Sequence, residues 1–330
     1  MTVVLRLLPR VADGPIIGTT RRGTGVGGQE PRVGVEQVRS LITAHARAEG
    51  DEVSGLPGVL VKKVTDPTEP TPSIAEPILA FSFQGSKRIA LGERVYDQTA
   101  GTFMVVAVDL PITGHYADAS RSEPYLGVAL ELRPAAIAEL LVGEAAGLRG
   151  IHTPPPPGIS IHRASPEIVE ALARLLALAD HPEDAPVLAP LVERELLWRV
   201  LSGPAGPTVR QIGLADSSLS YIGRAVRHLR SNAFEPIQVE ELAALSGMAV
   251  SSFHKHFRAV TSMSPIQYQK RLRLQVARLR LFHDPTDIAA VGHSVGYTSA
   301  SQFSREYRRE FGVPPSADAT RMRQAEQATA

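Results

Sequence analysis

One pattern of apolar and turn residues occurs twice in the C-terminal third of this 330-residue chain. Its first copy places apolar, glycine and proline residues at Val239, Leu242, Gly247, Phe253, Phe257 and Pro265. Its second copy places them at Ile288, Val291, Gly296, Phe303, Tyr307 and Pro315. The offset is 49 residues up to the glycine and 50 after it, so the second turn is one residue longer. The repeat predicts two helix-turn-helix units, a motif that lays its second helix in the major groove of DNA.

The second helix of each unit is expected to bury two aromatic residues and to present its opposite face to DNA. In the first unit the outward residues are Ser251, Ser252, His254, Lys255 and Arg258. In the second unit they are Ala300, Ser301, Gln302, Ser304 and Arg305, followed by Arg308 and Arg309. Hydroxyl, imidazole, amide and cationic groups hydrogen-bond to base edges and phosphates. We assign Arg258, Arg308 and Arg309 to phosphates and the other residues to base reading, and we expect Ser299 to cap the second recognition helix.

The segment between the two units, Pro265 to His283, is predicted to be a single helix, because proline opens it and Asp284-Pro285 follows it. Its 19 residues would form a rod of about 28 Å. Major-groove faces on one side of B-DNA repeat every ~34 Å, so this rod could hold two recognition helices in successive grooves. Its basic residues are expected to face solvent or phosphates: Lys270, Arg271, Arg273, Arg278 and Arg280.

Charge separates the C-terminal part from the rest of the chain. From Ile222 onward there are 15 Lys and Arg against 9 Asp and Glu, whereas the preceding residues carry 20 against 25. We therefore expect only the C-terminal part to bind a polyanion, double-stranded DNA. The lack of cysteine excludes disulfides, zinc-thiolate sites and thiol catalysis. No apolar run reaches the ~18–20 residues of a membrane span, so we expect no membrane contact and a cytoplasmic, nucleoid-associated location.

The N-terminal part is predicted to combine a small β-sandwich or barrel with helices, so that the whole chain is an α+β protein. Short β-rich runs broken by turns occupy residues 58–64, 78–83, 88–91, 102–108 and 125–130. Helical spacing begins at Val35, and helices resume from Pro134 and from Ser165-Pro166-Glu167. We expect a flexible arm at 1–32, a sensor and dimerisation domain at 33–213, a linker at 214–221, an all-α DNA-binding domain at 222–322 and a tail at 323–330.

The C-terminal region resembles the DNA-binding domain of the AraC/XylS family of bacterial transcription regulators. The matching stretches are 296–305 and 311–315. Residues 33–213 resemble the cupin-like N-terminal domain of one subfamily, through segments 84–88, 108–111 and 188–195. The resemblance implies base-reading positions at Ser251, His254 and Lys255 and at the second-unit residues named above. It also implies activation through RNA polymerase, a small-molecule effector in the cupin-like domain, and a homodimer.

Two positions depart from the family pattern. Ala249 stands where the first recognition helix often has a capping serine, so this helix is expected to start without a side-chain cap. Asp318 stands where many members have an aromatic residue, so the C-terminal tail is expected to pack differently.

Five residues of the N-terminal part could line an apolar effector pocket or belong to the ordinary core: Phe81, Phe83, Phe103, Met104 and Tyr116. A metal-dependent barrel enzyme would need clustered ligands, whereas this region offers His115 with scattered carboxylates. The nucleophile-elbow match at 292–296 falls in a helix-turn-helix turn, and no histidine follows Ser294. We therefore expect no catalytic residue, metal or cofactor. The alternatives are a barrel enzyme joined to a nucleic-acid tether, and a regulator controlled by a protein partner.

Overall fold

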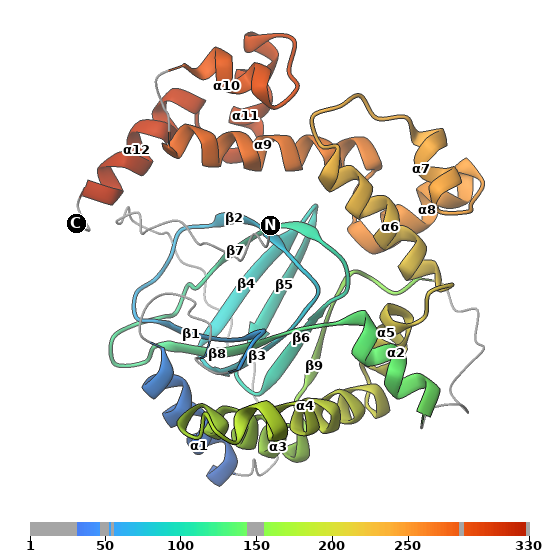
Figure 1. Ribbon diagram of the computed structural model, residues 1–330. Coiled ribbons are helices and arrows are strands. Elements are labelled where there is room, and N and C mark those ends of the chain that lie inside the picture. Colours follow the sequence, from blue (N-terminus) through green and yellow to red (C-terminus); the bar gives the residue numbers. More distant parts are fainter. Residues whose placement is uncertain (1–31, 47–52, 54–55, 144–154, 284–286, 328–330) are drawn as a thin grey trace, which may run out of the picture.

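The computed structural model describes residues 32–46, 53, 56–143, 155–283 and 287–327. Two antiparallel sheets face each other in its N-terminal part, and helices form its C-terminal part (Figure 1). The predicted α+β architecture is confirmed. The predicted arm lies outside the described residues, except that Arg32 begins the first helix. In the described part of the chain, no helix is long and apolar enough to cross a membrane.

The first sheet has five strands in the order β1-β8-β3-β6-β9. They are β1 Val59–Val64, β3 Ile78–Gln84, β6 Thr102–Val106, β8 Tyr125–Glu131 and β9 Ile159–Arg163. The second sheet has four strands in the order β2-β7-β4-β5. They are β2 Thr71–Ala75, β4 Ser86–Leu91, β5 Arg94–Thr99 and β7 Leu110–His115. The predicted β-rich runs overlap β1, β3, β4, β6 and β8. The other strands carry polar residues, proline or glycine, which hide their strand character.

Helices cover the outer face of the five-stranded sheet (Figure 1). The helices of this part are α1 Arg32–His45, α2 Pro134–Gly143, α3 Pro166–Ala177, α4 Ala185–Ser202 and α5 Gly206–Gly213, with a 3-10 turn at Leu178–Asp180. α1 contacts β1, β3 and β8, and α3 packs against both α1 and α4. The predicted helix start at Ser165-Pro166 is confirmed, with Ser165 at the N-cap position.

The strand register divides the predicted effector residues between two faces of this sheet. Phe81 pairs with Phe103 at 5.3 Å between ring centroids, on the strand face of Leu79, which shares a pocket with Leu196 and Leu197 of α4. Met104 has the opposite orientation and faces the second sheet. Tyr116 follows β7 at the end of the space between the sheets, and Phe83 lies at a β-bulge of β3. The five residues therefore do not line one surface.

The described residues of the C-terminal part form helices only. These are α6 Ser218–Ser231, α7 Val239–Leu245, α8 Val250–Thr261, α9 Pro265–His283, α10 Ile288–Ser294, α11 Ala300–Phe311 and α12 Pro315–Gln327. α9 has the predicted bounds and runs between the pairs α7–α8 and α10–α11 (Figure 1). The linker and tail predicted at 214–221 and 323–330 are partly helical. α6 starts early because the Ser217 hydroxyl accepts a hydrogen bond from Ser220 N at 2.9 Å.

Apolar packing differs between the two helix pairs. Phe253 and Phe257 of α8 belong to the same hydrophobic core as both sheets and α1 to α6. Phe303 and Tyr307 of α11 belong to a separate core, which they form with residues of α9 and α12. The first pair is thus continuous with the N-terminal part, whereas the second is packed on its own.

Candidate nucleic-acid interface

Glycine sets the turn of each helix-turn-helix unit. Four residues separate α7 from α8 and five separate α10 from α11, which confirms the longer second turn. Gly247 and Gly296 both adopt the left-handed conformation, with φ of 62° and 86°. A side chain strains the backbone in this conformation, which explains glycine at both turns. A Cβ at Gly296 would also lie 2.6 Å from the Phe234 carbonyl oxygen, whereas one at Gly247 would meet open space.

The first recognition helix, α8, has the predicted two faces. Phe253 and Phe257 are fully buried, with ring centroids 5.4 Å apart. The residues expected to face DNA are all exposed: Ser251, Ser252, His254, Lys255 and Arg258. Among the described residues, neither Lys255 nor Arg258 has an acidic side chain as a salt-bridge partner. Their charges are therefore available to a ligand.

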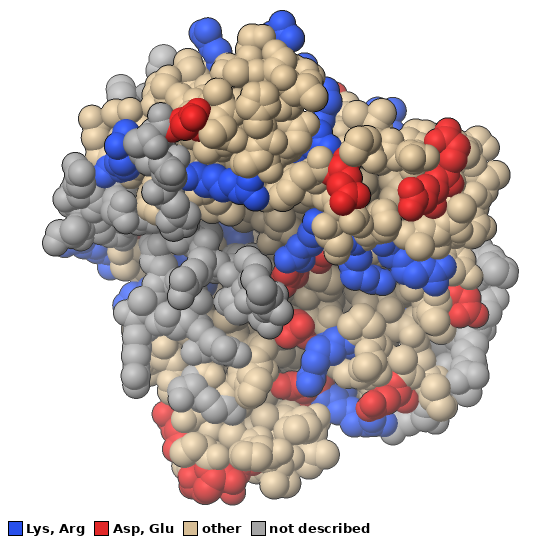
Figure 2. Space-filling view, turned by 45° about the horizontal axis from the view of Figure 1, so that its top comes forward, with Lys and Arg blue, Asp and Glu red and all other residues tan. Residues whose placement is uncertain are grey.

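The second recognition helix, α11, exposes most of its predicted residues: Ala300, Ser301, Arg305, Arg308 and Arg309. Gln302 and Ser304 are half-buried. Gln302 Nε2 lies 3.4 Å from Glu306 Oε1, so this side chain is partly engaged within the helix. Basic side chains protrude at the top of the molecule and lie across its middle in Figure 2.

The two recognition helices start differently. Ser299 caps α11, because its hydroxyl accepts a hydrogen bond from Gln302 N at 3.3 Å. Ala249 occupies the same position before α8 and offers no side-chain cap, as predicted. The first helix therefore lacks a hydrogen bond that the second possesses.

The basic residues of α9 are half-buried and bind other groups of the protein, so the expectation that they simply face solvent or phosphates was wrong. Lys270 Nζ lies 2.8 Å from Glu306 Oε1, and Arg271 Nε lies 2.8 Å from Glu310 Oε1. Both acids belong to α11, and the pKa of Glu306 is lowered by Lys270 and by the hydroxyl of Tyr297 although burial alone would raise it. The cations of α9 thus fasten the second recognition helix to the rod.

Arg273 and Arg280 of α9 bind backbone oxygens of both units. Arg273 donates to the carbonyl oxygens of Ala233 at 2.7 Å and Gly296 at 3.1 Å. Arg280 donates to the carbonyl oxygen of Ser294 at 2.9 Å. Because Ala233 precedes α7 and Gly296 lies in the second turn, Arg273 couples the positions of the two units.

Asp318 stands where many members of the family have an aromatic residue, and it is accommodated by an ion pair. Its side chain is 1% exposed and lies 2.8 Å from Arg278 Nε of α9. Tyr307 of α11 donates its hydroxyl to the same carboxylate at 2.7 Å, and burial raises the pKa of this tyrosine. One carboxylate therefore joins α9, α11 and α12. The sequence showed the unusual residue but not its partners.

The first unit and the helices α6 and α9 that flank it are also bound to the N-terminal part by polar contacts that the sequence did not reveal. Arg230 of α6 lies 3.0 Å from Asp109 and 2.6 Å from Glu76. These carboxylates raise the pKa of Arg230, although burial alone would lower it. The Tyr268 hydroxyl of α9 donates to the Asp109 carbonyl oxygen at 2.7 Å, and Gly158 N donates to the Val260 carbonyl oxygen of α8 at 2.8 Å.

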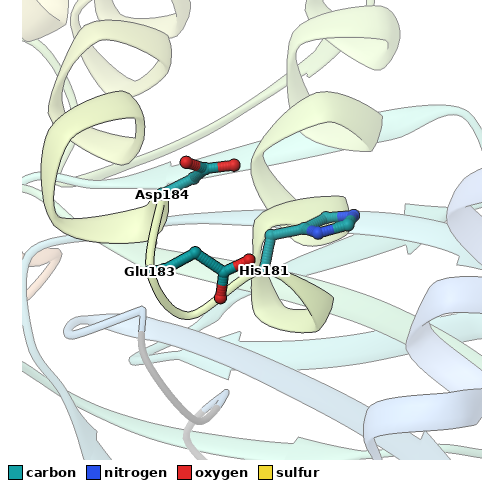
Figure 3. A group of neighbouring side chains, drawn as sticks. All are labelled: His181, Glu183 and Asp184. Atoms are coloured by element: carbon teal, nitrogen blue, oxygen red, sulfur yellow. The ribbon is translucent and has the colours of Figure 1, made fainter.

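Metal-type ligands gather at one place among the described residues, the turn between α3 and α4. His181, Glu183 and Asp184 each offer an atom within 4.8 Å of the others, and all three are exposed (Figure 3). His115, the histidine considered for a barrel metal, is not part of this group. Its partly buried ring instead lies near Arg88, and burial lowers its pKa.

Ser294 is the serine of the nucleophile-elbow match at 292–296. Its hydroxyl donates to the Val291 carbonyl oxygen of its own helix at 2.9 Å.

Family comparisons agree with this architecture of a two-sheet domain followed by a double helix-turn-helix. A model described as "AraC-type transcriptional regulator N-terminus" matches residues 55–208, and one described as "Helix-turn-helix domain" matches residues 242–321. The fold and the paired units define a protein with an AraC-type N-terminal part and a helix-turn-helix C-terminal part. The chain belongs to the AraC family of transcriptional regulators.

Curated relatives come from the same family. The HTH-type transcriptional regulator ExsA of Pseudomonas aeruginosa is 28% identical over 162 residues, covering 49% of this chain and 58% of the relative. The RCS-specific HTH-type transcriptional activator RclR of Escherichia coli is 36% identical over 86 residues, covering 26% of this chain and 30% of the relative. The chain thus spans about a third to three fifths of the length of these relatives.

A solved structure shares the overall fold. It is unsaturated fatty acid bound ToxT of Vibrio cholerae, with a TM-score of 0.50 and 11% identity, covering 79% of this chain and 94% of that chain. At this identity the likeness concerns the fold alone.

Proposed function

We propose that the chain is a sequence-specific transcription activator that binds double-stranded DNA through both helix-turn-helix units. The observation that carries this proposal is that the cations of the C-terminal part fall into two groups, those engaged within the protein and those that are exposed. Those of α9 are engaged in internal contacts, whereas Lys255, Arg258, Arg305 and Arg308 are exposed and lack acidic salt-bridge partners among the described residues. Cations without internal partners can neutralise phosphates without first breaking an ion pair.

Each predicted contact residue keeps its role in this proposal. The base readers are Ser251, Ser252, His254, Lys255, Ala300, Ser301, Gln302, Ser304 and Arg305. The phosphate-binding residues are Arg258, Arg308 and Arg309. Lys255 and Arg305 are the strongest candidates for base reading, because a cation can donate to two acceptors on a guanine edge.

Control by a small molecule in the N-terminal part is the second element of the proposal. The ToxT structure holds a bound unsaturated fatty acid, and RclR is a transcriptional activator; these two similarities support effector control and activation through RNA polymerase. An effector can act only if it binds one arrangement of the two parts more tightly than another. We assign no catalysis to the chain, and its DNA target implies a nucleoid-associated location.

A homodimer is the third element, and α4 offers the surface for it. Val187, Leu188 and Leu191 are 67%, 41% and 61% exposed, although they are large apolar residues. They lie on adjacent turns of one helix, where a second copy could cover them. Leu191→Lys should convert a dimer into a monomer in light-scattering measurements, and an unchanged mass would exclude this surface.

The DNA proposal is tested with an operator selected from a random library. Lys255→Ala and Arg305→Ala should each weaken specific binding by ~1–3 kcal/mol. Arg309→Ala should weaken specific and non-specific binding alike and flatten the dependence on salt. Arg121→Ala, an exposed arginine of the N-terminal part, is the control and should bind like the wild type. Unchanged affinity in all three test variants would refute the proposed contacts.

A further inference from the structure

The space between the two sheets contains a lysine. Lys87 of β4 pairs with Gln98 of β5, and both share the strand face of Ile89, which is completely buried. Gln98 donates from Nε2 to the Ala80 carbonyl oxygen of the other sheet at 2.6 Å. Lys87 and Gln98 therefore lie on the inner face of the second sheet, next to β3 of the first.

Lys87 has no carboxylate partner among the described residues. Its ammonium lies 5.4 Å from the centroid of the Tyr116 ring, and that ring packs on Tyr125 at 4.5 Å. Burial lowers the pKa of Lys87, and the group that opposes this effect is the phenol of Tyr125 rather than an acid. A cation in such a place is destabilising unless an anion compensates it.

Gln98 presents a second unsatisfied group. Its side chain is 0% exposed, and its Oε1 atom has no hydrogen-bond partner. The amide orientation is fixed, because Nε2 already donates to the Ala80 carbonyl oxygen. Oε1 therefore needs a donor that the protein does not supply.

Small residues leave room around these two groups. Ala80 of β3 and Ala129 of β8 are paired in register on central strands, yet both are partly exposed. On the facing sheet, Gly114 makes space for the Lys87 side chain, since a Cβ there would lie 3.4 Å from Lys87 Cε. Partial exposure of side chains between two sheets means that solvent-sized space exists there.

We propose that this space binds a small organic acid that carries a hydroxyl group, with its carboxylate on Lys87 and its hydroxyl donating to Gln98 Oε1. This inference rests on the proposed effector control and names the chemical class of the effector. The carboxylate supplies the missing counter-charge, and the hydroxyl supplies the missing donor. The wall of Tyr116 and Tyr125 provides an aromatic contact for the rest of the molecule.

Lactate, 3-hydroxybutyrate and mandelate, each compared with its neutral amide, are the probes. At least one acid should raise the melting midpoint of the full chain, whereas its amide should not. Lys87→Met should keep the fold, melt higher than the wild type without ligand, and bind the acid about 10- to 100-fold more weakly by calorimetry. Arg88→Gln, on the outward face of the same strand, should bind the acid normally.

An acid no better than its amide, or an acid that binds Lys87→Met as tightly as the wild type, would overturn the inference. A Lys87→Met midpoint below that of the wild type would show that the lysine is structurally required and would overturn it as well. Operator binding measured both with and without acid separates this failure from failure of the DNA proposal. Operator binding in either condition leaves that proposal standing, whereas its absence in both conditions removes both.

Discussion

The two helix-turn-helix units have the same local design but are held in place differently. The first unit shares its hydrophobic core with the sheets, and Gly158 donates to α8, while Asp109 and Glu76 hold the neighbouring helix α6. The second unit has its own core and is fastened to α9 by ion pairs and to α12 by the hydrogen bond from Tyr307 to Asp318. A change between the sheets can therefore reach the first recognition helix directly, whereas it reaches the second through the α9 rod.

Apolar and polar contacts therefore have different roles in holding the two units. Because the first unit shares its hydrophobic core with the N-terminal part, we expect the two to unfold together. Directional contacts such as those of Arg273 set the angle between the units, because the guanidinium binds carbonyl oxygens of both.

The largest effect should come from removing an aromatic side chain from either of the two hydrophobic cores. Phe257→Ala and Phe303→Ala should each lower the free energy of unfolding by ~3–5 kcal/mol. Hydrogen exchange should then rise in both α8 and the sheets for Phe257→Ala, but only in the second half of α9 and in α10 to α12 for Phe303→Ala. Exchange confined to α7 and α8 in Phe257→Ala would show that the shared core is not cooperative.

Removing the carboxylate that joins α9, α11 and α12 should be nearly as costly. Asp318→Ala leaves the largely buried Arg278 without its partner, so we expect a loss of about 3 kcal/mol in urea unfolding. Asp97→Ala is the control, because its pair with Arg88 is more than half exposed and should contribute at most about 1 kcal/mol. Similar small losses in both variants would remove Asp318 from the second core.

Gly158, which donates to the Val260 carbonyl oxygen, is the joint between the N-terminal part and α8. A methyl group at this position should disturb the first unit but not the second. A Cβ at Gly158 would lie 2.6 Å from the Val260 carbonyl oxygen, so Gly158→Ala should cost ~1–3 kcal/mol. Amide exchange should increase in α8 and remain unchanged in α11. Gly34→Ala is the matched control, since its Cβ would approach nothing closer than 3.4 Å. Equal protection of α8 in both variants would contradict the joint.

The smallest effect concerns the start of each recognition helix. Ser299→Ala removes the α11 cap and should cost ~0.5–1 kcal/mol, whereas Ala249→Ser should add a similar amount to α8. Differential scanning calorimetry of both variants measures the two changes. Opposite signs are expected, and equal signs would mean that these positions are not equivalent.

The features that the sequence predicted well depend on local patterns. Proline at 265 and Asp284-Pro285 bracketed α9, and the glycine and aromatic spacing located both recognition helices. Those it missed depend on pairing between distant segments. Arg230 and Asp109 are 121 residues apart, and nothing near either residue indicates the other. The cations of α9 looked solvent-facing for the same reason, because their partners lie on other helices.

The strands show the same limit. β5 reads Arg94-Val95-Tyr96-Asp97-Gln98-Thr99, so its inward residues Tyr96 and Gln98 are not apolar in the way that alternation requires. Phe81 and Phe103 looked suitable for a pocket because they are aromatic, but the register places them on the helix-covered face of the first sheet, together with Leu79. A face can be assigned only once the pairing partner is known.

The most direct test of DNA reading by both units uses the absence of natural cysteine. Ser251→Cys and Ser301→Cys give single attachment points on α8 and α11 for an iron chelate that cleaves nearby DNA. On a selected operator, we expect two cleavage centres separated by about one helical turn, ~10 base pairs, on one face of the duplex. Cleavage from only one position, or two centres on opposite faces, would contradict the account.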